Sequence, residues 1–163
     1  MIKQLVSLVI VASLSSCVTT YKIPESYTGS TAVIKDTAIK TGMTKAEAFQ
    51  VSKIEGQFDA TSPMATPYGG GMVVSLKESK RTIPAGKPIT LTITGGNIYA
   101  ADGAALADKM SGNAKKLVTG DVVFTPKPNG SYKVNGIAGK ESSSVWIEDG
   151  SIGKIVTQKI TKD

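Results

Sequence analysis

Apolar and polar residues alternate with a period of two along most of the chain from about Thr31 onward. The clearest run is the segment 87–96, in which Ile89, Leu91 and Ile93 share one face of an expected strand while threonines occupy the other. Such alternation is typical of a sheet that packs one face on a core and exposes the other face to water.

Shorter β-branched and apolar runs predict further strands in the segments STAVIKD (30–36), AFQVSKI (48–54) and MVVSL (72–76). A brief helical turn is expected just before the second of these runs, because Thr44 is a suitable N-cap residue and Glu47 stands three positions later. The segment 62–71 has the composition of a loop.

The segment 121–139 predicts a β-hairpin, since Asn129-Gly130 supplies the positive φ values that a tight turn requires. The apolar residues expected to meet across this hairpin are Val122, Phe124, Tyr132 and Val134. A second strand pair is expected at 144–148 and 154–160, joined by a turn at Asp149-Gly150.

One segment, Ala101–Asn113, breaks the period of two and is compatible with a short helix or a flexible loop. The remaining short strands and turn signals predict an all-β domain over residues 31–163. We therefore expect a small antiparallel β-sandwich, of the immunoglobulin or transthyretin kind, with one short helix or loop insertion.

The amino-terminal 16 residues do not alternate. Lys3 is followed by an apolar run from Leu5 to Leu14 and then by the small residues Ser15 and Ser16. A secretory signal peptide begins with a charged residue, continues with a short apolar run and ends with small residues at the cleavage site, and residues 1–16 have this pattern. The run is too short to span a bilayer, which takes about 20 residues. The alternative is a buried helix that opens the chain.

The tetrad Leu14-Ser15-Ser16-Cys17 resembles the lipobox of bacterial lipoproteins. This resemblance implies cleavage between Ser16 and Cys17 and attachment of lipid to the thiol of Cys17. Residues 17–30 then form the lipidated cysteine and a polar tether. Position 18 is a valine. An aspartate at this position favours inner-membrane retention in enterobacterial lipoproteins, so its absence implies that the lipid anchor lies in the outer membrane of a cell envelope. The alternative is an ordinary cleaved leader followed by an unmodified cysteine.

Three segments, 81–93, 122–134 and 145–156, also resemble a loose family of small bacterial lipoproteins with a β-sandwich domain. The shared features are a Pro-Ala-Gly turn, a threonine-rich strand, a Phe…Gly-x-Tyr hairpin and a final Trp-Ile-x-Asp strand pair. The resemblance implies a fold and supplies no catalytic residues.

Composition narrows the chemistry that is available. The chain has no histidine and only one cysteine, so it has no imidazole base or ligand, no internal disulfide and no thiolate zinc site. We expect neither a metal nor a cofactor. Removal of Lys3 with the leader takes the formal net charge from +6 to +5, which permits contact with anionic lipid. A single arginine, Arg81, argues against nucleic acid as a partner.

Several short motifs resemble catalytic or phosphate-binding sequences. Ser151-Ile-Gly-Lys154, the segment 111–113 and the segment 40–42 match motifs of penicillin-binding proteins and serine β-lactamases, but in reversed order and in too short a chain. The glycines 69–71 precede an expected strand, whereas a phosphate-binding loop precedes a helix. We interpret these matches as coincidental.

The candidate ligand contacts are Met64, Tyr68 and Trp146. Met64 and Tyr68 lie in the loop 62–71, and Trp146 is the only tryptophan. On a strand, either Trp146 or its neighbours Val145 and Ile147 face the core, and we expect Trp146 to be a core anchor. An indole on the other face would be a platform for a ligand.

Three functions follow as hypotheses. The first is a lipid-anchored, non-enzymatic binding or structural module of the cell envelope, with a protein or glycan partner reached through the loops 62–71 and 101–113. The second is an envelope hydrolase that uses serine, lysine or carboxylate groups. The third is an inhibitor or chaperone-like partner of an envelope enzyme.

Overall fold

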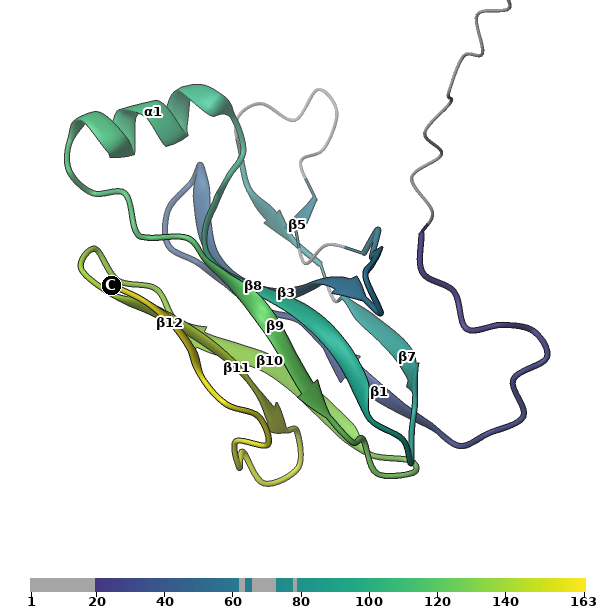
Figure 1. The fold of residues 1–163 in the computed structure, drawn as a ribbon. Coiled ribbons are helices and arrows are strands. Elements are labelled where there is room, and N and C mark those ends of the chain that lie inside the picture. Colours follow the sequence, from purple (N-terminus) through teal and green to yellow (C-terminus); the bar gives the residue numbers. More distant parts are fainter. Residues whose placement is uncertain (1–19, 62–63, 66–72, 78) are drawn as a thin grey trace, which may run out of the picture.

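Two β-sheets pack face to face around the core (Figure 1). The computed structural model describes residues 20–61, 64–65, 73–77 and 79–163. The first sheet has five strands, in the order β12 (Ile160–Lys162), β11 (Ser143–Asp149), β10 (Ser131–Ile137), β1 (Thr31–Lys35) and β7 (Lys80–Pro84). Its pairs are antiparallel except β1 with β10, which run parallel.

The second sheet is antiparallel throughout. Its strands are β2 (Thr37–Lys40), β3 (Lys45–Ile54), β8 (Ile89–Tyr99) and β9 (Val118–Phe124), with β4 (Gln57–Phe58) paired to β3. A separate pair is formed by β5 (Met64–Ala65) and β6 (Ser75–Leu76), and the single helix of the described residues is α1 (Asp102–Met110). The predicted all-β sandwich with one short helix is confirmed.

The alternation in β8 is confirmed by its burial. Ile89, Leu91 and Ile93 are buried between the sheets, while the threonines between them are half-buried. Thr92 and Thr94 face outward, where their hydroxyl groups pair with side chains of β9. One face of the strand is therefore buried and the other is exposed to water, as the sequence indicates.

The helical turn expected around Thr44 is wrong, because strand β3 begins at Lys45. An isolated turn of helix is unstable in water. Here the same residues pair with β2 on one side and with β8 on the other, and Ala46 and Ala48 are buried. The hydrogen bonds to two neighbouring strands outweigh the local capping preference.

The hairpin expected over residues 121–139 is also wrong, although its turn exists and Asn129 has a φ of 58°. Strand β9 pairs with β8, whereas β10 pairs with β1 and β11, so the connection crosses from one sheet to the other. Phe124 and Tyr132 still meet, with ring centroids 5.2 Å apart in an edge-to-face contact. They meet across the interior rather than along a hairpin.

The last expected strand, 154–160, is shorter in the structure. Only an isolated bridge joins Ile155 to Glu148, and the hydroxyl of Thr157 accepts the backbone N–H of Ile147. Strand β12 starts at Ile160. The strand expected at 72–76 is likewise reduced to β6 in the described residues.

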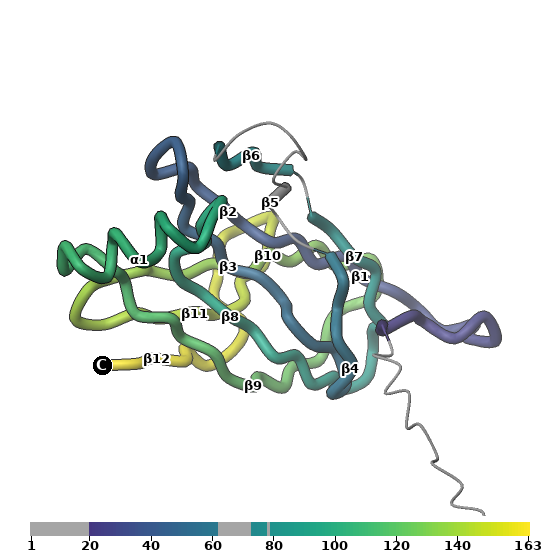
Figure 2. Tube along the Cα trace, turned by 90° about the horizontal axis from the view of Figure 1, so that it is seen from above, coloured from purple at the N-terminus to yellow at the C-terminus, as the bar shows by residue number. Residues whose placement is uncertain are grey.

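The two sheets are connected at one side by a corner at Asp36, between β1 and β2. Opposite, Ile160 of β12 lies against Gly120 of β9, so the two sheet edges approach one another. In Figure 2, α1 lies on one side of the body and β4 on the other. The sandwich therefore presents two distinct ends, and each carries one of the features described below.

Candidate functional site

Most of the predicted site residues lie outside the described residues. This holds for Ser16 and Cys17, the expected cleavage and lipidation positions, and for Tyr68. Of Met64 the structure describes only the backbone, which pairs with Leu76 in the β5–β6 ladder. Lipidation and ligand contact through these residues remain predictions.

Trp146 lies on the outer face of the first sheet. Its neighbours Val145 and Ile147 are completely buried between the sheets, so the pair, not the indole, forms the core. The side chain of Trp146 is nevertheless only 7% exposed. The ammonium of Lys159 lies 4.4 Å from the centre of the indole ring. Trp146 is thus covered by its own chain rather than open as a platform.

A polar network surrounds Trp146. The indole N–H donates to Glu148 Oε2 at 3.1 Å, and Asn135 Nδ2 and Lys133 Nζ lie 3.2 and 2.9 Å from Glu148 Oε1. Burial by itself raises the pKa of Glu148, but the hydrogen bonds from Lys133, Trp146 and Asn135 outweigh it and hold the pKa below its usual range. Glu148 is therefore a satisfied, ionised carboxylate rather than a proton donor.

A second cluster, which the sequence did not reveal, surrounds Arg81. Its guanidinium donates to both oxygens of Asp36 at 2.7 and 2.6 Å and also pairs with Asp59. Thr61 and Ser79 accept further hydrogen bonds from it. The side chains of Arg81, Asp36 and Asp59 are at most 7% exposed. The only arginine of the chain is thus engaged in an internal cluster of ion pairs.

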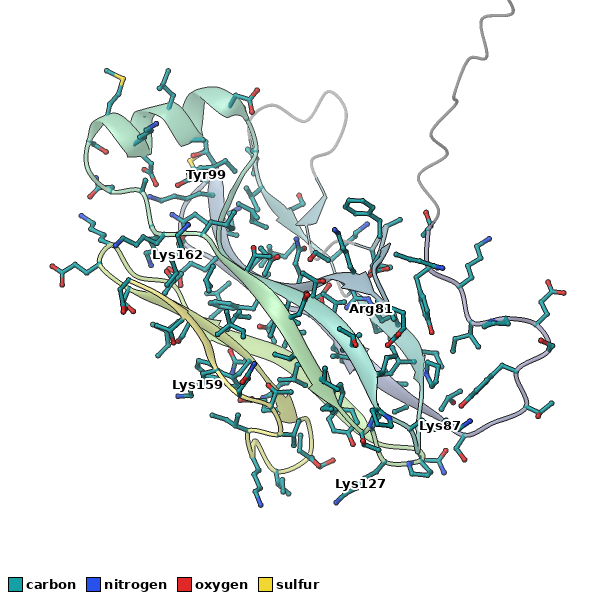
Figure 3. All side chains as sticks on the ribbon, in the orientation of Figure 1. Arg81, Lys87, Tyr99, Lys127, Lys159 and Lys162 are labelled. Atoms are coloured by element: carbon teal, nitrogen blue, oxygen red, sulfur yellow. The ribbon has the colours of Figure 1, made fainter. Side chains whose placement is uncertain are left out.

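The third feature is α1, which contains no buried residue. Polar side chains hold it: Lys45 Nζ binds both carboxylate oxygens of Asp108, and Tyr99 Oη donates to the same carboxylate. The hydrogen bond from Lys45 is the main cause of the lowered pKa of Asp108. Figure 3 shows Tyr99 directly beneath the helix. Downstream, Lys115 pairs with Glu47 of β3.

The half-buried residues of α1 are Ala104, Ala105 and Asp108, whereas its two large apolar side chains point outward. Leu106 and Met110 are 58% and 81% exposed. Exposed apolar side chains also occur in β2, the β2–β3 turn and the segment that leads into β9, namely Ile39, Met43 and Leu117. Contacts between Lys45 and Asp108 and between Ala100 and Thr44 hold the β2–β3 turn and the start of β3 close to α1. We call this region, with the exposed side chains Met43, Leu106 and Met110, the α1 end.

A pocket of about 410 Å³ opens near the β9–β10 connection. Among its lining residues are Lys127, Lys154, Asp149 and Tyr132, but no serine. The carboxylate of Asp149 accepts hydrogen bonds from the backbone N–H groups of Ser151 and Ile152, so it stabilises the turn after β11. The pocket therefore brings together cationic and aromatic groups, and its one aliphatic hydroxyl group belongs to Thr125.

The matches to penicillin-binding motifs do not converge. Figure 1 shows the turn after β11, which carries Ser151 and Lys154, at the opposite end of the body from α1. The segment 111–113 follows α1, and the segment 40–42 lies in the β2–β3 turn. Their separation agrees with the interpretation that the matches are coincidental.

The spacing of Leu106 and Met110, four residues apart, was visible in the sequence and fits one face of a helix. The direction in which that face points was not visible. The contacts of Arg81 left no signal in the sequence, because its partners Asp36 and Asp59 are far from it along the chain.

Comparison of the chain with protein-family models, with curated proteins and with solved structures returned no significant match. Within the described part of the chain, no helix is long and apolar enough to cross a membrane. The same residues contain no group of three or more acidic, histidine or cysteine side chains placed to bind a metal ion.

Proposed function

We propose that this chain is a lipid-anchored, non-enzymatic binding module of the bacterial cell envelope. Cys17 joins it to the outer membrane, and the α1 end contacts a protein partner. The lipobox of residues 14–17 supports the anchor. The observation that carries the binding role is the orientation of α1, whose two large apolar side chains face outward while polar contacts hold its inner face.

This orientation favours contact with a partner because exposed apolar area is costly in water. Burial of a leucine or methionine side chain stabilises a complex by roughly 1.5–3 kcal/mol relative to its exposed state. Clusters of such side chains on one surface mark sites of interaction. A helix that served only to cover the sheet would turn Leu106 and Met110 toward it.

The side-chain types favour a protein over a glycan. Sugars are commonly bound by aromatic platforms, yet the α1 end exposes aliphatic and methionine side chains. Met43 and Met110 are 72% and 81% exposed, and flexible thioether side chains adapt to the irregular apolar surfaces of proteins.

Site-specific photocrosslinking in intact cells tests the proposal. A photoreactive residue at Leu106 or Met110 is expected to capture one discrete protein. The matched control is Ile152, which is 73% exposed in the turn after β11, and no adduct is expected there. Equal capture at all three positions, capture of lipid at the α1 end, or no adduct at either helix position would contradict the proposal.

A further inference from the structure

The segment expected to form a free tether contacts the body at Thr20 and Tyr21. Thr20 forms a parallel bridge with Phe58 of β4, and the N–H of Tyr21 donates to the carbonyl of Phe58 at 2.8 Å. Tyr21 also packs against the core, and its partial burial raises the pKa of its hydroxyl group. The chain therefore meets the domain at β4.

This docking shortens the connection between lipid and domain. Cys17 precedes Thr20 by three peptide steps, which span at most about 11 Å at 3.8 Å per step. A free tether of residues 18–30 would reach about 45 Å. With the lipid on Cys17, β4 cannot lie far from the leaflet.

The surface around β4 has the chemistry of a membrane interface. Phe58 is 53% exposed, whereas the other two phenylalanines, Phe49 and Phe124, are 3% and 8% exposed. The ammonium of Lys53 lies 4.9 Å from the centre of the Phe58 ring. An aromatic ring with a cation beside it suits the boundary between acyl chains and phosphate groups.

We propose that Phe58, Lys53 and the adjacent Lys22 form a contact surface for the lipid leaflet, and that this surface fixes the orientation of the domain on the membrane. The inference rests on the proposed anchor at Cys17. The acidic neighbours are engaged elsewhere: Glu55 accepts the backbone N–H of Thr90 at 2.6 Å, and Asp59 pairs with Arg81.

The orientation that results is compatible with the binding role. Figure 2 places α1 on the opposite side of the body from β4. A leaflet at β4 leaves the α1 end free to meet a partner.

Depth-dependent fluorescence quenching tests the inference on the full-length, acylated protein in phosphatidylethanolamine–phosphatidylglycerol vesicles with brominated acyl chains. Mass spectrometry first establishes acylation of Cys17. A fluorophore is attached through Gln57→Cys, beside Phe58, or through Ala107→Cys on α1 as the matched control. Acylation of Cys17 leaves the introduced thiol as the only labelling site.

We expect the label at position 57 to lose about half of its fluorescence or more, since interfacial side chains enter ~5–10 Å into the headgroup boundary. The label at position 107 is expected to be unaffected. Phe58→Ser should reduce the quenching at position 57 while acylation is retained.

Two results would overturn the inference in distinguishable ways. An acylated protein with no quenching at position 57, or with equal quenching at position 107, removes the contact surface and leaves the anchor intact. A processed protein with an unmodified Cys17 removes the anchor and, with it, the contact surface.

Discussion

Arg81 donates two parallel hydrogen bonds to Asp36, with Nη1–Oδ1 and Nη2–Oδ2 distances of 2.7 and 2.6 Å. Asp36 occupies the corner at which the chain leaves β1 in the first sheet and enters β2 in the second. The same carboxylate accepts the N–H of Val51 at 3.0 Å and the hydroxyl of Ser79 at 2.7 Å. One buried ion pair thus ties the corner to strands of both sheets.

Asp36→Asn should therefore lower the free energy of unfolding by about 1.5–3 kcal/mol, because it removes the charged acceptor of two hydrogen bonds from Arg81 and leaves Asp59 as the only carboxylate partner of this guanidinium. Urea unfolding followed by circular dichroism measures the loss. Asp121→Asn is the control, since Asp121 is an exposed carboxylate that also accepts a side-chain hydrogen bond. Similar losses in the two variants would show that the buried pair has no special role.

Gly95 leaves room for the ring of Phe49, its cross-strand partner in the second sheet. A Cβ at position 95 would lie 2.6 Å from Phe49 Cδ1 and 3.3 Å from Val145 Cβ. Gly95→Ala should destabilise the protein by about 1–3 kcal/mol through overpacking.

The control for this change is Gly103→Ala in α1, where a Cβ meets nothing within 4 Å. It should leave stability unchanged or raise it by up to about 1 kcal/mol, because alanine favours a helix more than glycine does. Both variants are compared by thermal and urea unfolding. If both raised stability, the tight contact with Phe49 would be refuted.

Trp146 fluorescence should report the ionisation of Glu148. The folded-state pKa of Glu148 is lowered, so its network stabilises the fold fully above the ordinary glutamate pKa of about 4.3. That contribution is lost as the pH falls through the lower, folded-state pKa. The indole N–H then loses its charged acceptor, and the emission of the only tryptophan should change in this acidic range.

Glu148→Gln keeps the shape of the side chain and removes the titration, so its emission should not change over the same range. Acid unfolding is followed in parallel by circular dichroism, to separate the local change from global unfolding. A wild-type emission change centred above the ordinary glutamate pKa would rule out this assignment.

Lys45→Met should release α1 without unfolding the sandwich. The helix buries no side chain, and the contact of Lys45 with Asp108 is its best-defined attachment. Hydrogen exchange followed by mass spectrometry should show faster exchange in residues 102–110 and unchanged exchange in β8. The free energy of unfolding should fall by less than about 1 kcal/mol, as is usual for partly exposed ion pairs.

Lys87→Met is the control for this variant, since Figure 3 places Lys87 at the opposite end of the body from Tyr99. It should leave exchange in α1 unchanged. Unaltered exchange of the helix in the Lys45 variant would mean that other contacts hold α1 in place.

Local patterns along the chain were enough to predict the fold class and the two faces of the clearest strand. Alternation in β8 is a local property, because burial of one face of a strand requires apolar residues at every second position. The break in this period at Ala101–Asn113 likewise marked the place of the only helix of the described residues, although the sequence was equally compatible with a flexible loop there. These features depend on residues that are close together along the chain, so they can be predicted from a single sequence.

The pairing of the strands and the contacts between distant side chains could be read only from the folded molecule. Val33 of β1 pairs with Ser131 of β10 almost a hundred residues later, and Arg81 meets Asp36 across 45 positions. All strands offer the same N–H and C=O groups, so the backbone does not identify a partner. The choice depends on how all of the apolar faces pack together. The same packing turned Trp146 outward and left α1 with its two large apolar side chains in water.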